Sequence, residues 1–268
     1  MIELTALRKA FPGTEVLKDI SFSVHQGERV SLIGPGGSGK STILKILLGL
    51  VPPSGGEVLL FGRPIHRVGG EEREQLMRRL GVAFQQVGLF DFMTVEENLR
   101  FALEHKTKKN TGEIAASIDL LLHGVKLPHA KKLHTHELSG GMQRRIGIAR
   151  ALCGNPHIAI FDEPTSGLDP VTSTIILNMI LALAHGPEDN CLLVATSNVE
   201  IAIRFAERVI IINQGVVVAD GPWRELLLSG SPWVQKFLGV RLIGLDLSYA
   251  EELQLPAEFI GRHWKRSN

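Results

Sequence analysis

A glycine-rich octapeptide restricts the fold of this chain more than any other feature. It follows a short apolar run, Val30 to Ile33, which the pattern predicts as a buried strand. It leads into a segment with helical spacing, Ser41 to Leu50. A strand, a loop and a helix in this order form the context in which the spacing G-x-x-x-x-G-K-[ST] binds phosphate. The residues that fit this spacing are Gly34, Pro35, Gly36, Gly37, Ser38, Gly39, Lys40 and Ser41.

The residue types in this loop suit a nucleoside triphosphate. Glycines let backbone N–H groups turn toward phosphate oxygens, and the following helix adds partial positive charge at its N-terminus. Lys40 is expected to reach the β- and γ-phosphates, Ser41 to bind Mg²⁺ through its hydroxyl, and Thr42 to complete the loop. A surface turn with one lysine is the alternative, but it does not account for every fixed position being filled. ATP and Mg²⁺ are therefore the expected cofactors.

Two carboxylates follow a second apolar run. His157 to Phe161 is predicted as a buried strand, and Asp162 and Glu163 come directly after it. Carboxyl ends of parallel strands face the ligand crevice of an open α/β sheet. Asp162 is expected to hold Mg²⁺ through water, and Glu163 to polarise the water that attacks the γ-phosphate. Such a pair alone is often only a helix cap; together with the glycine-rich loop it predicts triphosphate hydrolysis.

A Leu-Ser-Gly-Gly-Met sequence, Leu138 to Met142, precedes a helical run from Gln143 to Leu152. It resembles the signature motif of the ATP-binding cassette (ABC) family, whose common form ends in Gln. The resemblance implies that Ser139, Gly140 and Gly141 donate to the phosphates of ATP bound by a second subunit. A head-to-tail homodimer with two composite sites is expected. The resemblance covers roughly residues 2 to 235.

Three further positions follow the family pattern. Gln85, in Phe-Gln-Gln, resembles the Q-loop glutamine, which the family places near Mg²⁺ and the γ-phosphate. Asp169, which ends Ser-Gly-Leu-Asp, resembles the D-loop residue at the dimer interface. Phe11 lies where the family places an aromatic ring on adenine, and it could equally be a core residue.

One position departs from the family. After the apolar strand that ends at Thr196, the family has His-Asp, whereas this chain has Ser197 and Asn198. The histidine contacts the γ-phosphate, and serine is shorter and cannot carry charge. Losing one preorganised donor typically costs about 10²–10³ in rate. Slow hydrolysis with intact ATP binding and dimerisation is predicted; the alternative is that Ser197 with a water, or another group, restores the contact.

The order of predicted elements gives the fold class. Strands alternate with helices, which predicts an α/β protein with a mainly parallel sheet covered on both faces. The resemblance implies a P-loop NTPase (RecA-like) core with a small antiparallel sheet, to which residues 2–25 would belong. An inserted helical subdomain is expected at about 86–150. Residues 1–239 would form the ATP-binding domain and 240–268 a C-terminal extension.

Composition limits the function classes. The net charge of +1 does not suggest a nucleic-acid binder held by bulk charge, which would need a basic face. No run reaches the roughly 18 apolar residues of a spanning helix, so a partner permease would have to supply a channel. Cys153 and Cys191 lie beside apolar runs, which predicts buried reduced thiols and a cytoplasmic location. The ABC resemblance implies that the chain lies at the inner face of the membrane through a permease.

The segment from Phe84 to Leu99, with the signature sequence, is similar to the ATPases of the Mla/Mce lipid-transport systems of bacterial envelopes. That resemblance implies a membrane permease and a lipid-binding substrate protein as partners, and a C-terminal extension that helps the dimer hold together. A second resemblance is to polar amino-acid import ATPases. A weakly hydrolysing regulatory subunit is the third possibility, which Ser197 keeps open.

Overall fold

The structure is a computed structural model that describes residues 1–183 and 190–242. Within these ranges the strands form one 10-stranded sheet. Its strands are β1 Ile2–Phe11, β2 Thr14–Val24, β3 Arg29–Ile33, β4 Gly55–Leu60, β5 Arg63–Pro64, β6 Leu80–Ala83, β7 Ile158–Asp162, β8 Cys191–Thr196, β9 Arg208–Asn213 and β10 Val216–Pro222. Their order in space is β5-β4-β1-β2-β10-β9-β3-β8-β7-β6. The predicted α/β class is confirmed.

The core of the sheet is parallel. Strand β3 pairs in parallel with β8 and β9, and β7 pairs in parallel with β6 and β8. Strands β7 and β8 are buried at every residue, as expected for parallel strands covered on both faces. The register places Ile33 opposite Thr196, and Asp162 opposite Ala195. The glycine-rich loop, the carboxylate pair and Ser197 therefore start from one edge of the sheet.

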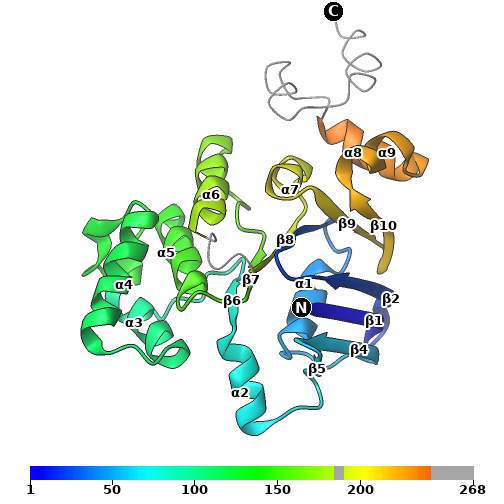
Figure 1. Cartoon of the computed structure of the whole chain (residues 1–268). Helices are drawn as coiled ribbons and strands as arrows, with labels where there is room; N and C mark the ends of the chain where they lie inside the picture. The colour runs from blue at the N-terminus through cyan, green and yellow to red at the C-terminus, as the bar shows by residue number, and fades with distance from the viewer. Residues whose placement is uncertain (184–189, 243–268) are drawn as a thin grey trace, which may run out of the picture.

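The antiparallel part is larger than expected from residues 2–25 alone. Strands β1, β2, β4 and β5 pair with their neighbours in antiparallel fashion. A parallel pairing of Val216 with Asp19 joins them to the rest of the sheet. Figure 1 shows these strands at one end of the molecule, with α1 packed behind them.

The helices of the described residues are α1 Lys40–Leu47, α2 Gly70–Arg78, α3 Val95–Lys106, α4 Thr111–Gly124, α5 Gly140–Leu152, α6 Pro170–Leu183, α7 Val199–Phe205, α8 Trp223–Ser229 and α9 Pro232–Leu242. Helices α3, α4 and α5 gather at the end of the molecule opposite the antiparallel strands (Figure 1). Capping boxes begin α3 at Thr94 and α4 at Asn110, where local hydrogen bonds satisfy the first backbone N–H groups. These helices occupy most of the range, about 86–150, for which an inserted helical subdomain is predicted.

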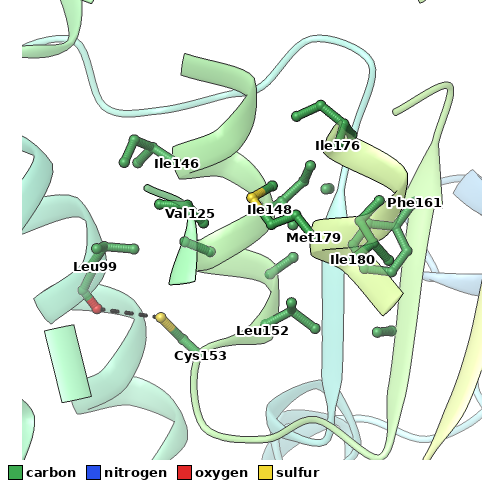
Figure 2. Packing of buried hydrophobic residues seen from close by; sticks show 14 of the residues in the cluster. Leu99, Val125, Ile146, Ile148, Leu152, Cys153, Phe161, Ile176, Met179 and Ile180 are labelled. Atoms are coloured by element: carbon green, nitrogen blue, oxygen red, sulfur yellow. Dashed lines mark hydrogen bonds between the residues drawn. The ribbon is translucent and has the colours of Figure 1, made fainter. Parts of the chain in front are cut away.

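Helix α5 packs against the carboxylate-bearing strand. Figure 2 shows Ile148 and Leu152 of α5 in one buried cluster with Phe161 of β7 and Met179 of α6. Close packing of this kind transmits displacement, because the interior has no free volume to absorb it. The position of Asp162 and Glu163 is thereby linked to the helix that begins at Gly140.

Both cysteines are buried and free, as predicted. Cys153 contacts the carbonyl oxygen of Leu99 at 3.9 Å (Figure 2). Helix α9 continues through Leu242, past the boundary expected at residue 239. Of the extension expected at 240–268, residues 243–268 lie outside the described residues. Among residues 1–183 and 190–242, no helix has the length and apolar character needed to cross a bilayer.

Candidate nucleotide-binding site

A cavity of about 430 Å³ lies at the edge of the sheet where β3, β7 and β8 end. Most of the predicted phosphate and catalytic residues share its wall. Its lining residues are Val16, Gly36, Gly37, Ser38, Gly39, Lys40, Ser41, Thr42, Gln85, Glu163, Ser166 and Ser197. Segments far apart in the sequence therefore form one concave site with several polar groups, as a nucleotide would require.

The backbone of the loop is shaped for an anion. Gly37 and Gly39 have φ of 76° and 107°, a left-handed conformation that side chains disfavour. A Cβ at Gly34 would overlap the carbonyl oxygen of Ile212, so the loop must pass close to β9. The Ser38 hydroxyl is buried and has no hydrogen-bond partner among the described residues. A phosphate oxygen would satisfy this donor, so the loop fits the ligand that its sequence predicts.

Lys40 is buried at the start of α1, and its ammonium lies over the loop. Nζ donates to the carbonyl oxygens of Gly34 at 2.8 Å and Pro35 at 3.1 Å. These contacts hold the positive charge beside the cavity. Gly34 and Pro35 thus position the lysine although they do not line the cavity themselves.

Ser41 and Asp162 bring oxygen ligands for a divalent cation together at the start of α1, and Gln85 lines the same cavity as Ser41. The Ser41 hydroxyl donates to Asp162 Oδ1 at 3.2 Å, and Gln85 reaches the cavity from the loop after β6, with Nε2 3.4 Å from Ser166 Oγ. Burial raises the pKa of Asp162, and the Ser41 hydrogen bond opposes that shift. A bound cation would offset the cost of burying this carboxylate. Hydroxyl, carboxylate and amide oxygens are the donors that Mg²⁺ prefers.

Several hydrogen bonds hold Glu163, and its own N–H donates to the carbonyl oxygen of Ala195 at 2.8 Å. Its Oε1 accepts from the backbone N–H of Ser197 at 2.8 Å, and its Oε2 accepts from the hydroxyl of Thr196 at 3.0 Å. Its carbonyl oxygen accepts from Arg144 Nη1 at 2.7 Å. The backbone φ of Glu163 is 45°, which a residue with a side chain rarely adopts unless its surroundings require it. Helix α5 and the end of β8 together impose this conformation.

A second cavity of about 280 Å³ adjoins the first, because Glu163, Ser166 and Ser197 line both. The short Ser197 side chain lies between them. Asn198 follows and caps α7, accepting from the N–H of Ile201 at 3.2 Å.

The signature residues and Asp169 do not line the 430 Å³ cavity of their own chain. Ser139 caps α5, accepting from the Met142 N–H at 3.3 Å. A Cβ at Gly140 or Gly141 would have no neighbour within 4 Å, so this backbone is open to an approaching group. Asp169 caps α6 through the Thr172 N–H and hydroxyl, and these hydrogen bonds lower its pKa.

Phe11 also stays outside the cavity. Its side chain is 44% exposed, with Lys9 Nζ 4.8 Å from the ring centroid, so it is not a core residue. Val16 lines the cavity instead, although nothing in its apolar pattern distinguished it from other strand residues. The sequence also did not predict that Thr196 and Arg144 contact Glu163. The only sequence signal for Thr196 is that it is a polar residue at the end of an apolar strand.

This fold and this site define a nucleoside-triphosphate-binding α/β protein. The family model described as ABC transporter matches residues 17–166. The chain belongs to the ABC transporter family. It is the ATP-binding subunit of an ABC transporter and an ATP hydrolase.

Relatives with different names share the cassette. Protein TRIGALACTOSYLDIACYLGLYCEROL 3, chloroplastic, of Arabidopsis thaliana is 35% identical, over 88% of this chain and 73% of that protein. The probable ribonucleotide transport ATP-binding protein mkl of Mycobacterium leprae is 36% identical, over 91% of this chain and 70% of that protein. The cell division ATP-binding protein FtsE of Bacillus subtilis is 35% identical, over 82% of this chain and 96% of that protein.

A solved structure agrees with the fold. The ATP-binding cassette MJ0796, in a dimeric post-hydrolysis state bound to ADP and Pi, superposes with a TM-score of 0.76 at 31% identity. The match covers 83% of this chain and 98% of that chain.

Proposed function

We propose that this chain binds Mg²⁺-ATP in the 430 Å³ cavity and hydrolyses it with Glu163 as general base. The observation that carries the proposal is the position of Glu163, which lines the same cavity as Lys40 and Ser41 with its carboxylate held by Ser197 and Thr196. Water attacks the γ-phosphorus, its proton passes to Glu163, and the bond to the β–γ bridging oxygen breaks. ADP and phosphate leave.

The other residues of the site position the phosphates of ATP and neutralise their negative charge. The loop N–H groups and Lys40 hold the β- and γ-phosphates. Ser41, Asp162 and Gln85 would hold Mg²⁺, which neutralises charge on the phosphate oxygens when bound. The oxygen atoms of these side chains support the metal site, and the buried Ser38 hydroxyl, which has no acceptor among the described residues, supports the phosphate site.

The functional unit is a homodimer in this proposal. Ser139, Gly140 and Gly141 lie outside the cavity, at the N-terminus of a helix whose backbone is open. Such a terminus favours a phosphate, and a second copy would bring one to it. The dimeric state of the MJ0796 structures supports this arrangement. Asp169 would then lie near the contact between the two chains.

An exposed aromatic cluster supports a membrane permease as partner. Phe92 is 76% exposed and lies against Phe90, which also contacts Phe101, with ring centroids 5.9 and 5.1 Å apart. The loop is held rigidly: the fully buried Asn98 accepts from the Phe90 N–H at 2.9 Å and donates to the Thr94 carbonyl at 3.0 Å. A rigid apolar surface after the Q-loop suits a protein partner. The chain would work at the cytoplasmic side of the membrane.

Lipid trafficking in the cell envelope is the proposed process, with a lipid-binding substrate protein as a further partner. The sequence around Phe84 to Leu99 supports it, and one relative is named after a galactolipid. Amino-acid import is the second candidate. The sequence resemblance concerns importers of polar amino acids, and a methionine import ATP-binding protein of Mesorhizobium japonicum is 34% identical.

Two experiments test these proposals. Purified wild type is expected to release phosphate from ATP, and Glu163→Gln to bind ATP but not to turn it over. Turnover by Glu163→Gln at the wild-type rate would refute the role of Glu163. For the partner, a tagged chain is purified from detergent-solubilised membranes beside Phe92→Ser and Leu120→Ser. Leu120 is a matched control because it is 74% exposed on α4.

A multi-spanning membrane protein should co-purify with wild type and Leu120→Ser, and be lost with Phe92→Ser. Loss from both variants, or from neither, would refute the proposed surface. In the reconstituted complex, ATP turnover should rise with lipid-loaded substrate protein and not with methionine. Stimulation by methionine alone would favour the second candidate.

A further inference from the structure

Thr196, the last residue of β8, is enclosed between Glu163 and the start of α7. It is fully buried, so its hydroxyl meets no solvent. The hydroxyl oxygen lies 3.0 Å from Glu163 Oε2 and 3.1 Å from the backbone nitrogen of Asn198. A buried polar group with two partners in a site of this kind has a defined orientation.

The direction of each hydrogen bond follows from the protons available. The Asn198 N–H can only donate, so the Thr196 oxygen accepts there. A hydroxyl carries one proton, and the carboxylate of Glu163 is its remaining partner. The Ser197 N–H donates to the other carboxylate oxygen at 2.8 Å. Each oxygen of Glu163 thus receives one fixed donor and keeps a lone pair for a water in the cavity.

This arrangement removes a freedom that a glutamate otherwise has. The terminal torsion of a glutamate is broad, so a lone carboxylate would sample many directions. A base must lie within hydrogen-bond reach of the water it activates, and misplacement is costly in rate. Two donors from consecutive residues of one chain segment fix the plane of the carboxylate as well as its position.

We propose that Thr196 is a positioning residue for ATP hydrolysis, acting through its hydroxyl on Glu163. The inference rests on the proposed role of Glu163 as general base. Thr196 does not line the cavity, so we expect it to act on turnover and not on binding. The backbone contact from Ser197 alone would leave the carboxylate free to swing about one oxygen.

The test compares Thr196→Val, which keeps the branched shape without the hydroxyl, with Thr196→Ser, which keeps the hydroxyl without the methyl group. Thr196→Val is expected to lower kcat roughly ten- to a hundredfold while KM for ATP changes by no more than about twofold. Thr196→Ser should keep kcat within about threefold of wild type. A kcat of Thr196→Val equal to wild type would overturn the proposal, as would equal loss in both variants.

Controls separate folding and the role of Glu163 from this effect. Thermal unfolding and ATP affinity are measured for each variant. If Thr196→Val does not fold, Thr196→Cys replaces it, because cysteine has the unbranched form of serine with a larger sulfur that donates only weakly. The kcat of Thr196→Cys must then fall well below that of Thr196→Ser. Glu163→Gln is assayed in parallel. Full turnover by Glu163→Gln would refute the role of Glu163 as general base. Loss of turnover in Glu163→Gln, together with wild-type turnover in Thr196→Val, would refute only the role of Thr196.

Discussion

Replacing Ser197 by histidine tests the departure from the family pattern. The structure has room for the change, because Ser197 lines both the 430 Å³ and the 280 Å³ cavities. The contact that Ser197 makes with Glu163 Oε1 comes from its backbone N–H at 2.8 Å. A new side chain therefore leaves that contact in place. The imidazole would enter the cavity that Lys40 and the phosphate loop line.

The expected gain follows from one added donor near the γ-phosphate. Removing a preorganised donor of this kind costs about 10²–10³ in rate, or about 2.7–4 kcal/mol. The cavity of a single chain is partly open to solvent, which weakens electrostatic interactions relative to a closed site. We therefore expect kcat of Ser197→His to rise by about 10², at the lower end of that range.

The assay is phosphate release at saturating Mg²⁺-ATP, with KM measured in the same series. Ser197→Gln is the matched control, since it adds length and a neutral donor without an imidazole. The double variant Ser197→His with Glu163→Gln should be inactive if the gained rate passes through Glu163. A folded, ATP-binding Ser197→His protein with wild-type kcat would refute the reasoning, and the contact would then be made by another group.

Three further predictions concern a charged hydrogen-bond donor, a close backbone approach and two buried thiols. Lys40→Ala should weaken ATP binding at least about tenfold in a titration with a fluorescent analogue, since a charged hydrogen-bond donor is lost; unchanged affinity would contradict the proposed cradle. Gly81→Ala should lower the free energy of unfolding, measured in urea, by about 2–4 kcal/mol, because the new Cβ would overlap a backbone carbonyl oxygen of α5. Gly112→Ala is the control: its Cβ would have no neighbour closer than 3.4 Å, so the free energy of unfolding should stay near that of wild type. Burial raises the pKa of Cys153 and of Cys191 to about 12, so at pH 8 both stay protonated and should react with a disulfide reagent at least about 100-fold more slowly in native protein than in urea. Fast native labelling would contradict that burial.

Sequence patterns predicted β3 and β7 because each is a short apolar run, closed by glycine after β3 and by carboxylates at the end of β7. The run from Val30 to Ile33 lies within β3, and the run from His157 to Phe161 lies within β7 apart from its first residue. The joining of the antiparallel strands to the parallel core could not be predicted. It depends on one pairing of Val216 with Asp19, which no local pattern encodes.

The residues of the site also differ in how far the sequence predicts them. The phosphate loop could be predicted because eight consecutive residues carry its geometry, and the left-handed φ of Gly37 and Gly39 agrees with it. The residues that hold Glu163 could not be predicted. Arg144 reaches it from α5 and Thr196 from β8, so each contact depends on how two elements pack.

Glu163 is the point at which these elements meet. Its carbonyl oxygen is bound by α5, its carboxylate by the end of β8, and its backbone holds a conformation that few residues adopt without such support. Helix α5 begins at Gly140 and is capped by Ser139, and we propose that these residues contact ATP bound by a second chain. A displacement of α5 as the two chains close would therefore move the carbonyl of Glu163 against a carboxylate fixed at β8. Arg144→Met, which cuts the contact with α5, should lower the rate of hydrolysis in the dimer while leaving ATP affinity of the single chain unchanged.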